Sequence, residues 1–127
     1  MMTKRMAALV AAAALAASGA PAFANEPVPT KVGQCVTTAV KAIGTRLQGV
    51  AGSGSTILYS DGLSQVSYDT VPGIVASKIG DKVTLCLFML PVNCPKGDDR
   101  GKMYKASNLR TKQNWLEADS EHSCGGA

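Results

Sequence analysis

Four cysteines constrain this chain more than any other feature of its 127 residues, because each disulfide would join two distant segments of a small fold. They are Cys35, Cys86, Cys94 and Cys124. An even count of cysteines behind an export leader is typical of two disulfides. Zinc is the competing use, but the chain has no C-x-x-C pair and only one histidine, His122. The sequence therefore predicts two disulfides, no metal and no other cofactor.

Four cysteines allow three pairings, and the sequence cannot choose rigorously among them. We expect Cys35 to pair with Cys86, because Cys86 lies in the middle of a predicted strand and can be bridged to a neighbouring strand. Cys94 lies in a predicted loop and Cys124 in a polar tail that has little else to order it. We therefore expect these two to form the second bridge.

Residues 1–24 have the features of a secretory signal peptide. Lys4 and Arg5 precede an apolar run of 12 residues, and Ala22-Phe23-Ala24 offers small side chains at a cleavage site after Ala24. The run is shorter than the roughly 20 residues that span a bilayer, which favours a cleaved leader. A retained membrane anchor is the alternative. Cleavage would leave 11 basic and 9 acidic side chains, a net charge of +2, in the periplasm or outside the cell.

The segment from Cys35 to Val50 fits two kinds of secondary structure. Val36, Val40 and Ile43 recur at helical spacing. Many of its residues are β-branched, however, which favours a strand, and Gly44 would serve a bulge that changes the inward face. The β-branched residues are Val36, Thr37, Thr38, Val40, Ile43 and Thr45. We predict a bulged strand, with a helix as the alternative.

Further short β-rich segments follow, with turn signals between them. Asp61-Gly62 is a strong hairpin signal, and Arg110-Thr111-Lys112 joins the last two predicted strands. Lys82–Leu90 is apolar on both faces, which is typical of a buried strand. We predict an all-β fold at 35–127, a partly open antiparallel barrel of five to six strands, SH3-like or OB-like, after an extended arm at 25–34.

Several motifs in the second half of the chain resemble a group of small exported proteobacterial proteins that have no assigned function. They are NCPKGDDRGKMY (93–104), NLRT (108–111), Trp115 and the closing DSEHSCGGA (119–127). The resemblance covers most of the chain after the leader. It implies a Gram-negative periplasmic or secreted setting, and it brings no catalytic residues with it.

Basic residues are concentrated within 17 positions in which Asp98 and Asp99 are the only acids. They are Lys96, Arg100, Lys102, Lys105, Arg110 and Lys112. One interpretation is a solvated face whose charge is neutralised by the acidic tail when Cys94 joins Cys124. The other is an open site for a phosphate or carboxylate, which arginine recognises well. A net charge of +2 makes nucleic acid an unlikely partner.

These features predict a small binding or interaction module rather than an enzyme, as an accessory or inhibitor of an envelope enzyme. The candidate binding residues are Lys96, Arg100, Lys102, Arg110, Lys112 and Trp115. The expected partner is a protein or an anionic envelope ligand. The first alternative is an anion- or polyanion-binding protein that uses the basic 96–112 region. The second is a small hydrolase that uses His122, the only imidazole.

Overall fold

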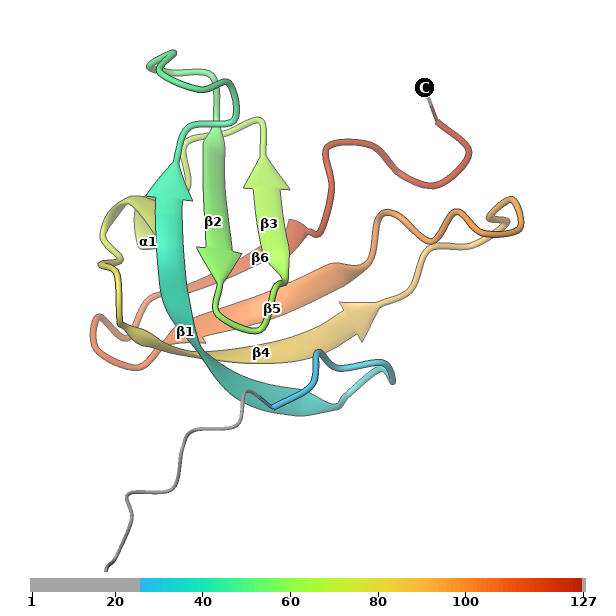
Figure 1. Cartoon of the computed structure of the whole chain (residues 1–127), viewed down its shortest axis with the longest axis horizontal. Coiled ribbons are helices and arrows are strands. Elements are labelled where there is room, and N and C mark those ends of the chain that lie inside the picture. Colours follow the sequence, from blue (N-terminus) through green and yellow to red (C-terminus); the bar gives the residue numbers. More distant parts are fainter. Residues whose placement is uncertain (1–25, 127) are drawn as a thin grey trace, which may run out of the picture.

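Six antiparallel strands close into one barrel in the order β1-β2-β3-β6-β5-β4, with β4 returning to β1 (Figure 1). The computed structural model describes residues 26–126. Its elements are β1 (Cys35–Gly44), β2 (Ser55–Tyr59), β3 (Ser64–Ser67), α1 (Pro72–Val75), β4 (Lys82–Met89), β5 (Met103–Asn108) and β6 (Asn114–Ala118). The predicted all-β barrel is confirmed with six strands, and it is closed rather than partly open.

β1 belongs to both layers of the barrel. Its first half, 35–39, pairs with β4, and its second half, 40–44, pairs with β2. In Figure 1 β1 bends from the layer of β4, β5 and β6 into the layer of β2 and β3, whose strands cross the first layer steeply. A register shift between Val40 and Ala42 lies at the point where β1 changes partner. A bulge of this kind bends a strand and so helps a barrel to close.

The same bulge explains the helix-like spacing in the sequence of β1. Val36 and Val40 face the core before the bulge and Ile43 packs against it afterwards, because one extra residue reverses the alternation. The predicted bulged strand is confirmed and the helical alternative is wrong. The bulge lies before Gly44 rather than at it, and residues 45–50 form a loop beyond the end of the strand.

The barrel interior is filled by alternate residues of the strands and is covered at one end by α1. The buried hydrophobic side chains are Val36, Val40, Ile57, Tyr59, Leu63, Val71, Ile74, Val83, Leu85, Leu87, Tyr104, Ala106 and Trp115. Gly73 of α1 lies against the indole of Trp115, where an added Cβ would be 2.5 Å from Cε3. Only glycine allows α1 to approach the core this closely.

β4 buries one face only. Val83, Leu85 and Leu87 point into the core, whereas Phe88 and Met89 at its end are exposed. A register irregularity against β5 between Leu87 and Met89 turns this end away from the interior. The prediction that both faces of this strand are buried is wrong, because the outer face of a barrel wall one layer thick meets solvent.

Both predicted disulfides are confirmed. Cys35 and Cys86 are directly opposite in the β1–β4 ladder, with their Cα atoms 4.0 Å apart. Cys94 and Cys124 have Cα atoms 5.2 Å apart and tie the loop between β4 and β5 to the tail after β6. One bridge therefore lies on the sheet, and the other joins two irregular segments.

The arm before β1 is anchored to the barrel although it contains neither strand nor helix at 26–34. Pro29 is buried, Val28 packs against the core, and the Thr37 amide donates to Glu26 Oε2 at 2.7 Å. The predicted signal peptide at 1–24 lies outside the described residues. Within the described part, no helix has the length and apolar character needed to cross a bilayer.

Candidate functional site

The residues of the predicted basic site lie at opposite ends of β5. Arg100 and Lys102 precede the strand, whereas Arg110 and Lys112 follow it. Six extended residues, each rising about 3.3 Å, separate the two groups. Figure 1 shows the loop before β5 and the turn after it on opposite sides of the barrel. The structure therefore does not bring the two groups together, because the strand between them is extended.

Arg100 and Lys102 are paired with carboxylates of their own loop. Arg100 donates from Nε and Nη2 to the two oxygens of Asp98 at 2.9 and 3.0 Å. Lys102 Nζ donates to Asp99 Oδ2 at 2.8 Å and lies 3.8 Å from Asp119 Oδ2. Arg100 and Lys102 hold the pKa values of Asp98 and Asp99, respectively, below their usual range. This agrees with the interpretation of a solvated face whose positive charge is neutralised. Most of the neutralising negative charge comes from Asp98 and Asp99 of the loop rather than from the acidic tail.

The tail adds hydrogen bonds to this assembly, both from its backbone and from the side chain of Asp119. Arg100 Nη2 donates to the Gly126 carbonyl at 3.1 Å, and the Gly125 amide donates to Asp98 Oδ2 at 3.0 Å. Asp119 Oδ1 accepts from the amides of residues 101 and 102. Together with the Cys94–Cys124 bridge, these bonds fix the loop and the tail to each other.

Arg110 belongs to a polar cluster at the other end of the barrel. Its Nε and Nη2 donate to the two oxygens of Asp81 at 2.7 and 2.9 Å. Asp81 is buried and also accepts from Asn108 Nδ2 at 3.0 Å and from the Lys78 amide at 2.8 Å. Asn108 Nδ2 donates further to Ser77 Oγ at 2.9 Å. The Arg110 guanidinium, which was expected to bind an external anion, thus already binds an internal carboxylate with two hydrogen bonds.

We expect the Asp81 cluster to stabilise the fold above about pH 4 and to lose this effect in acid. The hydrogen bonds from Arg110 hold the pKa of Asp81 well below its usual range, so the folded chain binds a proton there less readily than the unfolded chain. Thermal melts between pH 7 and pH 3 test this. Asp81→Asn should melt below the wild type at pH 7, and the difference should shrink as the pH falls. Asp69→Asn, at an exposed carboxylate outside the cluster, is the control; an equal pH dependence in both variants would contradict the assignment.

Trp115 is part of the core rather than of a binding surface. Only 6% of its surface is exposed, and its Nε1 donates to Gln65 Oε1 at 2.9 Å. Tyr59 is also buried and donates to the same oxygen. The position of Trp115 therefore does not support a role as a binding residue.

The remaining basic side chains of the region are separate and exposed. Lys96, Lys105 and Lys112 have no ion-pair partner among the described residues. Lys96 lies in the loop before β5, Lys105 lies on β5 and Lys112 lies in the turn after it. They do not form a cluster around one point, and no single anion could contact all three.

His122 is exposed on the tail, and its carbonyl accepts from Ser120 Oγ at 2.7 Å. Its imidazole has no hydroxyl or carboxylate partner among the described residues, so the base and nucleophile of a hydrolase are not brought together there. Residues 26–126 also contain no group of three or more His, Cys, Asp or Glu side chains placed to hold a metal ion.

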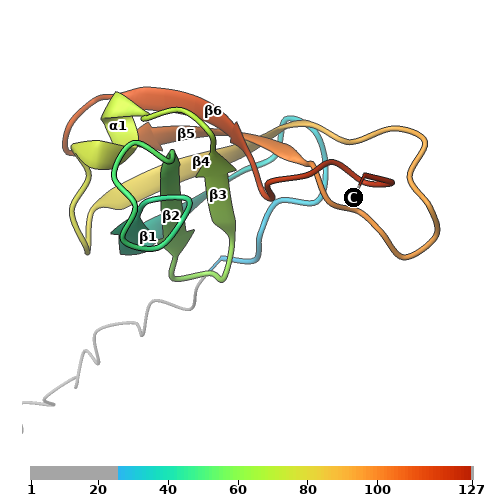
Figure 2. The ribbon, with the colours of Figure 1, turned by 90° about the horizontal axis from the view of Figure 1, so that it is seen from above.

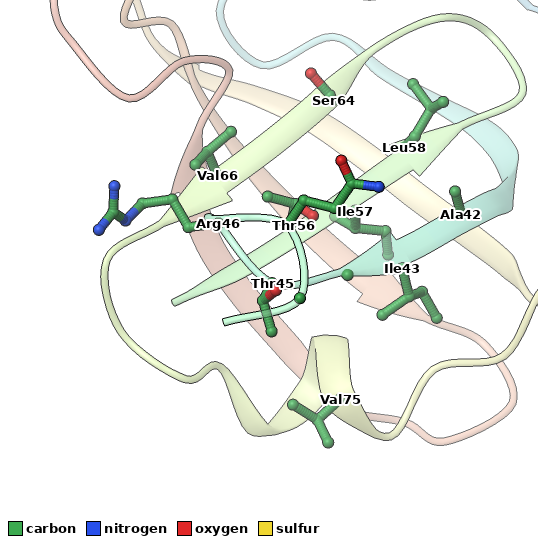
Figure 3. Close-up of a pocket in the computed structure, with 13 residues that line it drawn as sticks. Ala42, Ile43, Thr45, Arg46, Thr56, Ile57, Leu58, Ser64, Val66 and Val75 are labelled. Atoms are coloured by element: carbon green, nitrogen blue, oxygen red, sulfur yellow. The ribbon is translucent and has the colours of Figure 1, made fainter. Parts of the chain in front are cut away.

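A groove on the outer face of β1, β2 and β3 is the site that sequence reasoning missed. It has a volume of about 700 Å³ and is closed on two sides by the 45–54 loop and by Val75 of α1 (Figure 3). Its floor consists of the outward residues of three paired strands, Ala42 and Gly44, Thr56 and Leu58, and Ser64 and Val66. The sequence did contain a signal for this groove. Outward positions of a hairpin usually hold charged residues, and here they hold small or apolar ones.

The groove is neutral as well as largely apolar. Among the described residues that line it, Arg46 is the only charged one, and in Figure 3 the guanidinium points away from the other lining side chains. This group lies 4.2 Å from the centre of the Tyr68 ring, donates from Nε to the Ser53 carbonyl at 2.8 Å, and lies 3.7 Å from Glu121. The groove therefore offers apolar surface with a few hydroxyl groups and no free charge.

Three comparisons with known proteins add no relative. A scan against protein-family models, a search of curated proteins and a search of solved structures each found no match.

Proposed function

We propose that this protein is a small exported binding module that catalyses no reaction and holds apolar side chains of a partner protein in the β1–β2–β3 groove. The groove carries the proposal, because cavities of several hundred Å³ with mainly apolar walls and a few polar groups are typical of binding sites. Leu58, Val66 and Val75 provide apolar contacts, and Thr56 and Ser64 provide hydroxyl groups for hydrogen bonds to the backbone of the bound segment.

The periplasm, or the medium outside the cell, is the proposed location. The leader at 1–24 supports export, and two disulfides suit an oxidising compartment. The bridges also restrain the barrel before a partner arrives, which lowers the ordering cost of binding. A rigid module of this size suits an accessory or inhibitor of an envelope enzyme.

The groove is favoured over the basic 96–112 region as the binding surface. Arg100, Lys102 and Arg110 are already paired with carboxylates, so an external anion would have to displace internal partners. Binding in the groove should therefore persist at raised salt, whereas polyanion binding should weaken steeply.

Selection of peptides from a random display library on the oxidised protein tests the groove. We expect apolar peptides whose affinity falls at least about tenfold for Leu58→Glu and for Ala42→Trp, because the first introduces a charge and the second fills the space. Leu116→Glu, at an exposed leucine on the outer face of β6, is the matched control and should bind normally. Peptides that bind all three variants equally, or that require Arg100, would refute the proposal.

A further inference from the structure

A second apolar surface lies at the end of β4, outside the groove. Phe88, Met89, Leu90 and Val92 each expose between 43% and 78% of their surface. Regular alternation would turn every second residue inward, but the irregularity after Leu87 leaves Phe88 without a partner in β5 and directs the following residues outward as well. Consecutive exposed apolar residues are unusual on a soluble domain unless they have a function.

Val32 extends this surface from a different part of the chain. The turn at 31–34 lies beside the end of β4, because the Gly33 amide donates to the Leu87 carbonyl at 2.8 Å and the Leu87 amide donates to the Gln34 carbonyl at 3.0 Å. Figure 2 shows this turn and the end of β4 together at one end of the barrel. Val32 is 59% exposed there. We call the five residues Val32, Phe88, Met89, Leu90 and Val92 the apolar end.

The two disulfides hold the apolar end in place. Cys86 lies two residues before Phe88, and its partner Cys35 lies three residues after Val32. On the other side, Cys94 lies two residues after Val92 and is bridged to the tail. The exposed segment is therefore fixed on both sides although it contributes little to the core. A surface restrained in this way loses less conformational entropy when it binds.

Three lysines lie close to the apolar end along the chain or across the β4–β5 ladder. Lys31 adjoins Val32, Lys105 lies opposite Cys86 across the β4–β5 ladder, and Lys96 lies in the loop that follows Val92. These lysines have no ion-pair partner among residues 26–126. The acids of the same loop, Asp98 and Asp99, are already paired with Arg100 and Lys102. The free charge beside the apolar end is therefore positive.

We propose that the apolar end docks on the surface of an anionic phospholipid bilayer. The apolar side chains enter the boundary between headgroups and acyl chains, and the lysines contact lipid phosphates, an arrangement that fits both the exposed apolar area and the sign of the free charge. This contact is peripheral and leaves the groove on β1, β2 and β3 open. It does not depend on the function proposed for the groove.

Vesicle flotation with the full, oxidised protein tests the proposal. We expect binding to vesicles that contain about one third phosphatidylglycerol, and weaker binding to pure phosphatidylcholine or at high salt. Phe88→Ser should weaken binding about tenfold and Lys31→Gln about fivefold. Ile79→Ser, at a 76% exposed residue before the opposite end of β4, is the matched control and should bind like the wild type, as should Leu58→Glu in the groove.

A spectroscopic readout separates insertion from loss of folding. Phe88→Trp should shift its emission to the blue when anionic vesicles are added, whereas Ile79→Trp should not. Equal binding to both vesicle types, an equal loss in Phe88→Ser and Ile79→Ser, or no binding at all would overturn the proposal. A wild-type dimer in sedimentation that Phe88→Ser dissociates would also overturn it, because the apolar end would then be covered by a second copy of the chain.

Discussion

Replacing Gln65 with leucine is expected to lower the free energy of unfolding by about 4 kcal/mol, close to the whole stability of a marginal domain. The Gln65 amide is fully buried and makes four hydrogen bonds. Its oxygen accepts from Tyr59 and Trp115, and its nitrogen donates to the carbonyls of Tyr104 and Glu117 at 2.9 and 3.0 Å. Leucine would leave the Tyr59 hydroxyl and the Trp115 indole N–H without their acceptor in the core, and it would remove one hydrogen bond from each of the two carbonyls.

The position of Gln65 makes this loss specific to one part of the barrel. β3 and β6 share a single residue pair, Val66 with Ala118, so their contact is the weakest in the ladder. The bonds from Gln65 to the backbone of β5 and β6 supplement it. Gln65→Leu should therefore increase hydrogen exchange in β3 and β6 before the other strands.

Urea denaturation and amide exchange measure the two effects, with Gln113→Leu at an exposed glutamine as the control. The control should unfold within about 0.5 kcal/mol of the wild type. A loss below about 1 kcal/mol for Gln65→Leu, with unchanged exchange in β3 and β6, would show that the barrel closes without this amide.

Removing the Cys35–Cys86 bridge by a double alanine substitution is expected to lower the free energy of unfolding by about 4 kcal/mol. The bridge closes a loop of 51 residues, and the estimate follows from the chain entropy that this loop removes from the unfolded state. Urea denaturation of the double variant measures it. A loss below about 1 kcal/mol would show that the β1–β4 ladder holds without the bridge.

The double alanine variant at Cys94 and Cys124 provides the comparison. Its loop of 30 residues gives a similar entropic estimate of about 4 kcal/mol. Its local consequence should differ, because this bridge joins two irregular segments rather than two paired strands. Limited proteolysis should cut the loop at 91–101 before other sites in this variant, and it should show no such preference in the Cys35–Cys86 variant.

Much of the fold was predictable because its signals are local in the chain. The Asp61-Gly62 turn joins β2 to β3, with Gly62 at a φ of 93° that glycine adopts readily. The turn at 110–112 joins β5 to β6 as predicted. The cysteine pairing followed from the expected strand and loop around each cysteine, which the structure confirms.

The candidate site was less predictable, because it depends on which distant residues meet. Charge density along the sequence suggested one basic site, but an extended strand separates Arg100 from Arg110 and each arginine has its own carboxylate. Asp81 is 29 residues from Arg110 in the chain, and no local pattern pairs them. The groove likewise depends on distant pairings, because its floor includes Ala42 of β1 opposite Leu58 of β2, beyond the bulge.

The sequence by itself determined the β-rich character, the turns and the cross-links, since alternation, glycine placement and cysteine position act over a few residues. Only the tertiary structure decided the partners of Gln65 and Asp81, the separation of the basic residues and the outward direction of Phe88. These depend on closure of the barrel, which places residues tens of positions apart within hydrogen-bonding distance and decides which face of each strand is buried.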